Sequence, residues 1–145
     1  MRSYVDSGVL VKLYIRERNS SDAISALGQL KFLELNQLQE LEIRNTFRAL
    51  EGRNLISSFQ RAASEHELEA DLIKGRLRRN LPDWGMAFKE ANNLSQLYTA
   101  ETLARSLDLL HVAIAVVSSS DLFLTGDKRQ YAVAQKAGLQ ARLIE

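Results

Sequence analysis

The chain of 145 residues contains no cysteine and only one proline. Without cysteine it can have no disulfide framework, no thiolate zinc site and no cysteine nucleophile. No apolar run approaches the roughly 20 residues that a membrane-spanning helix needs. The N-terminus also lacks the basic region and long apolar stretch of a signal peptide. These absences lead us to expect a cytoplasmic protein that does not associate with membranes.

The chain has no large excess of positive or negative charge, since 19 basic and 18 acidic side chains give a net charge of +1. A hydrophobic content of 46% and a charged content of 26% are ordinary for folded proteins. The length fits one compact domain over residues 1–145. If a cation neutralises the acids described below, the remaining surface is moderately basic, which permits a polyanionic substrate but does not require one.

The spacing of apolar residues predicts strands that alternate with helices. Strands are expected at 3–6, 31–35, 121–125 and 139–144. Helices are expected at 7–17, 20–30, 37–53, 57–79, 86–98, 107–119 and 128–138, with a loop at 99–105 and Ser106 as the N-cap of the helix that follows. Such alternation predicts an α/β fold with a mainly parallel sheet covered on both faces, and a helical excursion near 57–97.

Four acids lie where an apolar element begins, ends or presents one face: Asp6, Glu42, Asp108 and Asp127. α/β proteins place ligand-binding groups at the ends of their strands. Two carboxylates about 5 Å apart repel each other by roughly 3 kcal/mol at an effective dielectric near 20. A divalent cation relieves that repulsion, and hard oxygen ligands favour Mg²⁺ or Mn²⁺. Taken together, the four acids predict a metal-dependent enzyme.

Each acid also has a purely structural interpretation. Asp6 and Asp127 are each placed to cap a helix that follows directly. Asp108 falls in the first turn of a helix, where the helix dipole favours a negative charge. Glu42 lies inside an amphipathic helix, where most glutamates are solvated, and Glu40 is a rival two residues away.

Three polar residues accompany the acids. Ser7 follows Asp6, and Thr125 lies two residues before Asp127 and can direct its hydroxyl toward the same site. His111 lies one turn after Asp108 in a helix otherwise made of leucine, valine, alanine and isoleucine. Because a lone histidine in such a helix is more often a core residue than a ligand, we place His111 beside the ligands at most.

At these residues the sequence resembles the PIN-domain nucleases, and among them the VapC-like toxins of toxin–antitoxin modules. VDSGVLVKLY is similar to the opening strand of the family, and LEIRNTFRAL is similar to its glutamate helix. RSLDLLHVAIA followed by FLTGDKRQYAVAQKAGL is similar to its C-terminal signature. The resemblance covers nearly the whole chain. It assigns the family's acids to Asp6, Glu42 (rather than Glu40), Asp108 and Asp127.

The resemblance implies a single PIN domain over residues 1–145, with a three-layer α/β/α fold and a sheet of four to five strands. It implies an endoribonuclease that uses Mg²⁺ or Mn²⁺ and hydrolyses RNA with an activated water. The four acids would hold the ion, while Ser7 and Thr125 would orient ligands or water. Lys128 and Arg129, next to Asp127, are the basic residues expected to contact RNA phosphates.

The resemblance also implies two protein partners. One is an antitoxin whose C-terminal segment wraps the chain and contacts the early helices and residues 57–80. The other is a second copy of the chain in a homodimer. Two alternatives remain open: a catalytically silent PIN-like binding module and a PIN nuclease that cuts DNA. A receiver-like phosphoacceptor domain is disfavoured, because Asp108 begins a helix with no strand before it.

Overall fold

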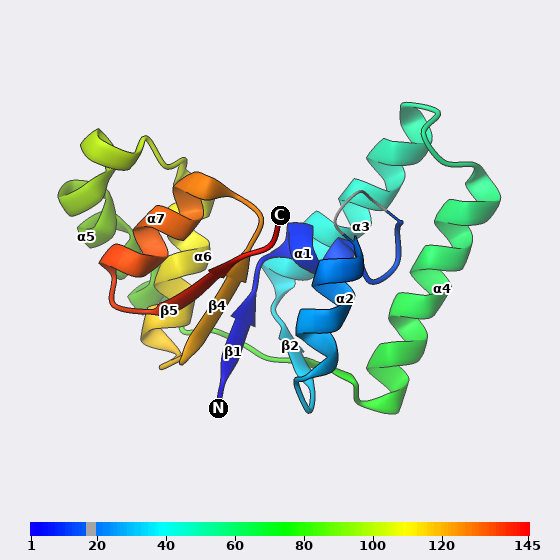
Figure 1. The fold of residues 1–145 in the computed structure, drawn as a ribbon, viewed down its shortest axis with the longest axis horizontal. Coiled ribbons are helices and arrows are strands. Elements are labelled where there is room, and N and C mark those ends of the chain that lie inside the picture. The colour runs from blue at the N-terminus through cyan, green and yellow to red at the C-terminus, as the bar shows by residue number, and fades with distance from the viewer. Residues whose placement is uncertain (17–19) are drawn as a thin grey trace. The chain divides into compact units, whose positions relative to one another are not determined.

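The computed structural model describes residues 1–16 and 20–145, in which strands and helices alternate (Figure 1). The strands are β1 (Ser3–Val5), β2 (Leu33–Leu35), β3 (Leu77–Arg79), β4 (Leu122–Thr125) and β5 (Gln140–Leu143). The helices are α1 (Ser7–Val11), α2 (Ser20–Gly28), α3 (Gln37–Gly52), α4 (Ser58–Lys74), α5 (Trp84–Thr102), α6 (Ser106–Val117) and α7 (Lys128–Lys136). The predicted α/β class is confirmed. Within the described residues, no helix is both long enough and apolar enough to cross a membrane.

The chain divides into two compact units. Met1–Asp6 and Leu81–Glu145 form one, here called the terminal unit, and Ser7–Asn80 form the other, here called the central unit. The terminal unit therefore contains Asp6, Asp108 and Asp127, while the central unit contains Glu42. The expectation of one domain over residues 1–145 stays a prediction.

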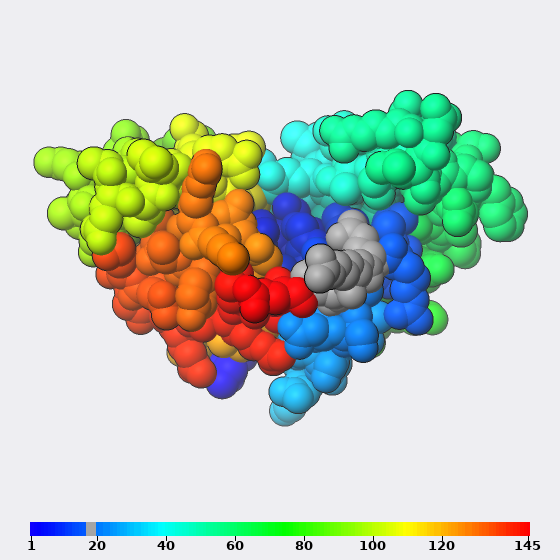
Figure 2. Space-filling view, turned by 45° about the horizontal axis from the view of Figure 1, so that its top comes forward, coloured from blue at the N-terminus to red at the C-terminus, as the bar shows by residue number. Residues whose placement is uncertain are grey.

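The terminal unit is built on a three-stranded parallel sheet in the order β1-β4-β5. Val5 pairs with Leu124, and Thr125 pairs with Leu143, so β4 is hydrogen-bonded on both sides. Figure 2 shows α7 and β5, in orange and red, packed side by side. α6 packs against both α5 and α7 and is buried along most of its length. Its burial explains the continuous apolar run of its sequence.

The central unit has a two-stranded parallel sheet, in which Leu33 of β2 pairs with Leu77 of β3. α1 and α4 both pack against α3. Phe47 of α3 is fully buried, and the ring of Tyr14 meets it edge-on at 6.1 Å between ring centroids. Asn36 and Gln39 form a reciprocal capping box at the start of α3, which fixes where that helix begins.

β3 is the main departure from the expected elements. The sequence predicted a helix to about residue 79, but α4 ends at Lys74 because Gly75 adopts a left-handed conformation with φ of 80°. Leu77, only 1% exposed, then pairs with β2. The five strands therefore lie in two hydrogen-bonded sets of three and two.

Three helix ends also differ from expectation. α1 ends at Val11 and continues as hydrogen-bonded turns through 12–15; Glu17, where the predicted helix ended, lies outside the described residues. α5 continues to Thr102 through the expected loop and ends where Leu103 takes a φ of 57°. The N-cap of α6 is Arg105 rather than Ser106.

Candidate functional site

The ends of β1 and β4 meet, as the sequence predicted for strands of one parallel sheet. The backbone N–H of Asp6 donates to the carbonyl of Leu124 at 2.9 Å, which extends the pairing beyond the last residue of β1. Thr125 is the last residue of β4 and is fully buried. Its Oγ1 donates to Asp6 Oδ2 at 3.3 Å. A predicted acid and a predicted hydroxyl are thus brought together.

Asp127 caps α7 and is tied back to the same threonine. Its Oδ1 accepts the backbone N–H groups of Arg129 at 2.8 Å and of Gln130 at 3.1 Å. Its own backbone N–H donates to Thr125 Oγ1 at 3.0 Å. The structural interpretation of Asp127 as a helix cap is therefore confirmed. These contacts hold its carboxylate near the end of β4.

Asp108 is 7% exposed in the first turn of α6 and also serves as a cap. Its Oδ2 accepts the backbone N–H of Arg105 at 3.0 Å. The Arg105 guanidinium contacts Asp108 Oδ2 through Nε and Asp127 Oδ2 through Nη2, both at 3.4 Å. One arginine therefore contacts two of the predicted acids. Its side chain is 70% exposed, so each ion pair is weak and screened by salt.

Gln130 is a buried polar residue that the sequence reasoning missed. It is 1% exposed, and its Oε1 accepts the Thr125 hydroxyl at 2.7 Å. Its Nε2 donates to the backbone carbonyl of Asp108 at 3.5 Å. Helical spacing places it on one face of α7 with the buried Val133 and Ala134, and that pattern is the signal that predicts a buried glutamine.

These contacts define an acid network in the terminal unit, made of Asp6, Arg105, Asp108, Thr125, Asp127 and Gln130. Each carboxylate in the network meets at least one neutral donor, either a backbone N–H or the threonine hydroxyl. Among residues 1–16 and 20–145, however, no three aspartate, glutamate or histidine side chains gather closely enough to hold a metal ion on their own.

The donor chemistry of the network nevertheless suits a small hard cation. All of its acidic ligands are carboxylate oxygens, which Mg²⁺ and Mn²⁺ prefer. Mg²⁺ usually keeps several waters and binds through one or two carboxylates rather than a full protein cage. Asp108 and Asp127, which both contact Arg105, are the two carboxylates of the network that would supply such ligands.

His111 is buried, as the core interpretation of this residue predicted. It is 2% exposed, and its Nδ1 lies 2.6 Å from the hydroxyl of Tyr4. The Tyr4 ring stacks on Phe123 with 5.4 Å between centroids. The histidine thereby joins α6 to β1 one turn beyond Asp108.

Glu42 lies in the central unit, where the Ser7 hydroxyl donates to its Oε1 at 3.2 Å. Glu40, the rival two residues away, is held instead by Arg79 and Arg44. The hydrogen bonds from Arg79, supported by those from Arg44, lower the pKa of Glu40. Glu40 is therefore paired with two arginines, and the assignment of Glu42 to one site with the other three acids stays a prediction.

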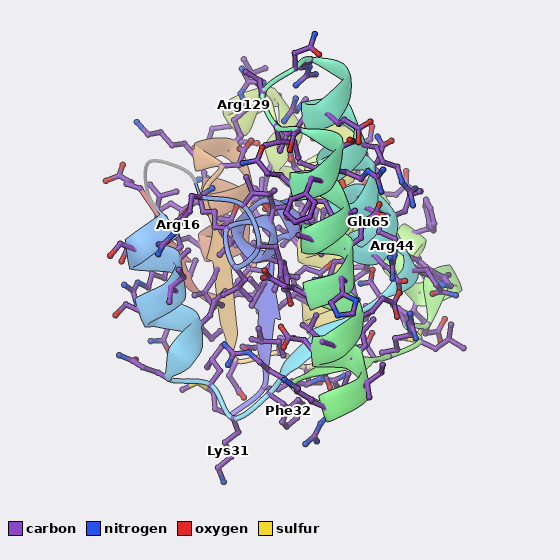
Figure 3. The ribbon with its side chains drawn as sticks, turned by 90° about the vertical axis from the view of Figure 1, so that its right-hand side faces the viewer. Arg16, Lys31, Phe32, Arg44, Glu65 and Arg129 are labelled. Atoms are coloured by element: carbon purple, nitrogen blue, oxygen red, sulfur yellow. The ribbon has the colours of Figure 1, made fainter. Side chains whose placement is uncertain are left out.

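The basic residues predicted to meet RNA, Lys128 and Arg129, are exposed in the first turn of α7. Figure 3 labels Arg129, together with Arg44 of α3 and Glu65 of α4. Since Asp127 caps the same turn, both cations lie within two residues of a network carboxylate.

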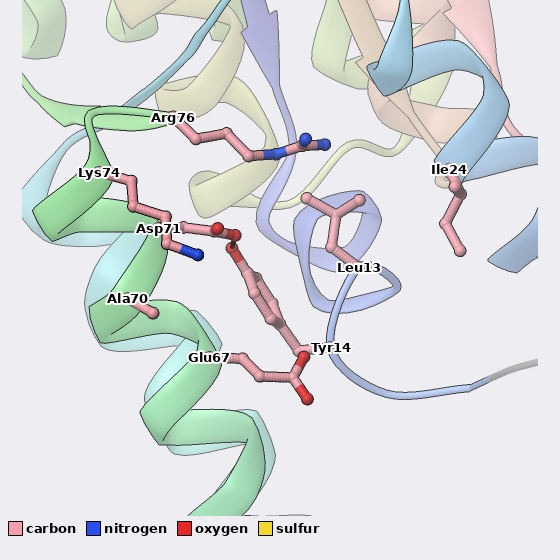
Figure 4. Close-up of a pocket in the computed structure, with 8 residues that line it drawn as sticks. All are labelled: Leu13, Tyr14, Ile24, Glu67, Ala70, Asp71, Lys74 and Arg76. Atoms are coloured by element: carbon pink, nitrogen blue, oxygen red, sulfur yellow. Dashed lines mark hydrogen bonds between the residues drawn. The ribbon is translucent and has the colours of Figure 1, made fainter.

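A pocket of about 360 Å³ lies in the central unit (Figure 4). Its lining includes Tyr14, whose hydroxyl donates to Asp71 Oδ2 at 2.7 Å. Burial and this hydrogen bond raise the pKa of the Tyr14 phenol well above its ordinary range. The other lining residues are Leu13, Ile24, Glu67, Ala70, Lys74 and Arg76, so the lining contains none of the predicted site residues.

No protein-family model matches the chain, and no curated protein sequence matches it. Its fold is similar to a solved structure, FitAcB from Neisseria gonorrhoeae, with a TM-score of 0.68. The match covers 96% of this chain and 95% of that chain at 14% sequence identity. At that identity the likeness establishes the fold.

Proposed function

We propose that the chain is a metal-dependent endoribonuclease of the PIN-domain, VapC-like type, the toxin component of a toxin–antitoxin pair. The observation that carries the proposal is the acid network, in which Asp6, Asp108 and Asp127 are joined at the ends of parallel strands and the starts of helices. The sequence motifs support the proposal at the same residues. The likeness to FitAcB supports it at the level of the fold.

In the proposed site, Asp6, Glu42, Asp108 and Asp127 hold Mg²⁺ or Mn²⁺. Glu42 is included because LEIRNTFRAL is similar to the glutamate helix of the family. The ion, when bound, lowers the pKa of a water and neutralises charge that develops on the phosphate. Thr125 holds the Asp6 carboxylate and the Asp127 backbone in place. Lys128 and Arg129 attract the RNA backbone, so binding weakens as salt rises.

The proposed partners are RNA, a cognate antitoxin and a second copy of the chain, in the cytoplasm. For the antitoxin, the sequence resemblance implied contact with the early helices and residues 57–80. The pocket in Figure 4 combines these regions, with Tyr14 and Ile24 from the first and Asp71 from α4. Its mixture of apolar and charged side chains supports that surface as the place where the antitoxin binds.

The proposal is tested by cleavage of a structured RNA pool with Mn²⁺ or Mg²⁺, using protein freed of any antitoxin. Asp6→Asn and Asp108→Asn are each expected to reduce cleavage by roughly 100-fold or more. Asp83→Asn is the matched control, because Asp83 caps α5 through the Met86 N–H but lies outside the acid network. Its cleavage rate should equal that of the wild type.

The alternatives are separate outcomes of the same experiment. Mn²⁺ binding without cleavage of any nucleic acid would favour the silent binding module. Cleavage of DNA but not RNA would identify a DNA nuclease. Cleavage that survives both Asp6→Asn and Asp108→Asn would place the chemistry elsewhere and contradict the proposed site.

A further inference from the structure

Gln130 has no part in the proposed chemistry, yet it is almost completely buried beside the acids. A glutamine amide carries one acceptor and two donor hydrogens, and burying them without partners is costly. Its oxygen meets the hydroxyl of Thr125 on β4, and its nitrogen faces the backbone carbonyl of Asp108 on α6. The residue therefore connects two elements that carry predicted ligands, from a position on a third, α7.

The direction of each hydrogen bond follows from chemistry. The carbonyl of Asp108 only accepts, so the amide nitrogen of Gln130 must face it and the amide oxygen must face Thr125. The Thr125 oxygen already accepts the N–H of Asp127, which leaves its single proton to donate. Thr125 shares that one proton between Gln130 Oε1 at 2.7 Å and Asp6 Oδ2 at 3.3 Å, and the shorter bond, to Gln130, is the stronger. The hydroxyl is thus oriented by Gln130.

We propose that Gln130 is a positioning residue that sets the spacing between the carboxylates of Asp108 and Asp127 for a cation. Through Thr125 it fixes the backbone N–H of Asp127, and through the Asp108 carbonyl it fixes the first turn of α6. Its own backbone N–H also donates to the Asp127 carboxylate. This inference rests on the proposed function, because it assigns Gln130 to the same metal site.

Gln130→Met separates this role from simple packing, because methionine has a similar volume but neither hydrogen-bonding group. Removing partners that orient metal ligands typically weakens metal affinity by roughly 10- to 100-fold. The Mn²⁺ dissociation constant of Gln130→Met should therefore rise by at least about tenfold. Gln135→Met is the matched control: Gln135 lies on the same helix but is exposed and bonds only the Tyr131 hydroxyl among the contacts described.

The experiment has a metal-free arm and a metal arm. Hydrogen exchange of the Asp127 amide, measured by NMR without metal, should accelerate by roughly five- to tenfold in Gln130→Met, because its acceptor Thr125 is no longer held. Mn²⁺ binding is measured by electron paramagnetic resonance, with circular dichroism as the check on folding. Gln130→Leu replaces Gln130→Met if the methionine variant does not fold.

Wild-type Asp127 exchange and wild-type Mn²⁺ affinity in the Gln130 variant would overturn the inference. Weaker Mn²⁺ binding in Gln135→Met of the same size would also overturn it, since the effect would then not be specific to the network. Wild-type protein that binds no Mn²⁺ contradicts the proposed function itself. In that case the metal-free arm still decides, because unchanged Asp127 exchange refutes the positioning role and accelerated exchange supports it.

Discussion

The carboxylates of the two units have different hydrogen-bond and ion-pair partners. In the central unit, four glutamates are held by four arginines. Arg44 pairs with Glu40 and Glu69, Arg79 pairs with Glu40, Arg48 pairs with Glu65, and Arg61 pairs with Glu51 and Glu65. We call this set the arginine ladder. In the terminal unit, Asp108 and Asp127 share the single exposed Arg105, and their other described partners are neutral backbone N–H groups.

This difference supports the proposed metal site. In the ladder, acids and arginines are equal in number, so the set is neutral and a metal would have to displace arginines. The two aspartates with one arginine keep a net negative charge, while neutral donors hold their geometry. A cluster that is ordered but not neutralised is the arrangement that attracts a divalent ion. Glu40 belongs to the arginine ladder, whereas Glu42 is a ligand only in the proposed site.

The largest effect on stability is expected from Thr125→Val, which removes the hydroxyl at the centre of the acid network. The change leaves the Asp127 N–H and the Gln130 oxygen without their partner, so the free energy of unfolding should fall by about 2–3 kcal/mol. Urea unfolding measures this. Thr46→Val, which removes a half-buried hydroxyl bonded within α3, should cost less than about 0.5 kcal/mol. Equal losses of unfolding free energy in the two variants would show that the acid network stabilises the fold no more than a hydroxyl within a helix does.

Tyr14→Phe tests the hydrogen bond from a half-buried phenol to Asp71, which lies outside both the acid network and the arginine ladder. Loss of the bond to Asp71 should cost about 1–1.5 kcal/mol, against a few tenths for the control Tyr131→Phe, whose hydroxyl accepts the exposed Gln135 amide. Because the folded pKa of Tyr14 is raised, its contribution is complete below the unfolded pKa near 10 and declines as the pH rises above it. Urea unfolding at pH 8 and pH 11 should show this decline in the wild type and a smaller one in Tyr14→Phe. A phenol that ionises near its ordinary pKa in the folded protein would contradict the account.

Glu40→Gln tests the arginine ladder. We expect a loss of about 0.5–1 kcal/mol at pH 7 and low salt, because these ion pairs are partly exposed. The folded pKa of Glu40 is lowered, so its contribution is present above the unfolded pKa near 4.3 and is lost as the pH falls through the folded pKa. Glu67→Gln, an exposed acid of α4, is the control. If the free energy of unfolding of Glu40→Gln differs from that of the wild type by the same amount in strong acid as at pH 7, the ion-pair explanation is ruled out.

Arg105→Gln is expected to have the smallest effect on stability and to change Mn²⁺ affinity directly. Removing the arginine shared by Asp108 and Asp127 removes a competitor for the same carboxylates. Mn²⁺ should then bind about two- to fivefold more tightly, because an exposed ion pair contributes only about 0–1 kcal/mol. Arg48→Gln, the ladder control, should leave Mn²⁺ affinity unchanged. Weaker Mn²⁺ binding in Arg105→Gln would mean that this arginine supports the site instead of competing for it.

Local sequence signals predicted the strands that carry the site. Asp6 and Thr125 could be placed at the ends of parallel strands because the apolar runs before them are short and helices follow. The meeting of these ends then follows from the α/β topology. β3 was not predicted, because three residues with one buried leucine give no detectable alternation inside a polar, helix-prone segment.

The polar partners of the acids were harder to predict than the acids themselves. Gln130 was expected inside a helix and Arg105 in a loop, and neither position indicates a partner for the acids. The packing of α7 against β4 and α6 buries Gln130 and brings Asp127 to Arg105. The structural and functional interpretations of Asp108 and Asp127 also prove compatible. Both residues cap helices, and capping is what fixes their carboxylates in place.

We propose that the acid network, and not the arginine ladder, binds a divalent cation. The direct test is a Mn²⁺ titration of the wild-type protein, Asp108→Asn and Glu40→Gln, followed by electron paramagnetic resonance. We expect the wild type and Glu40→Gln to bind Mn²⁺ with equal affinity, and Asp108→Asn to bind it at least about tenfold more weakly. A wild-type protein that does not bind Mn²⁺, or an Asp108→Asn variant that binds it as the wild type does, would contradict the account.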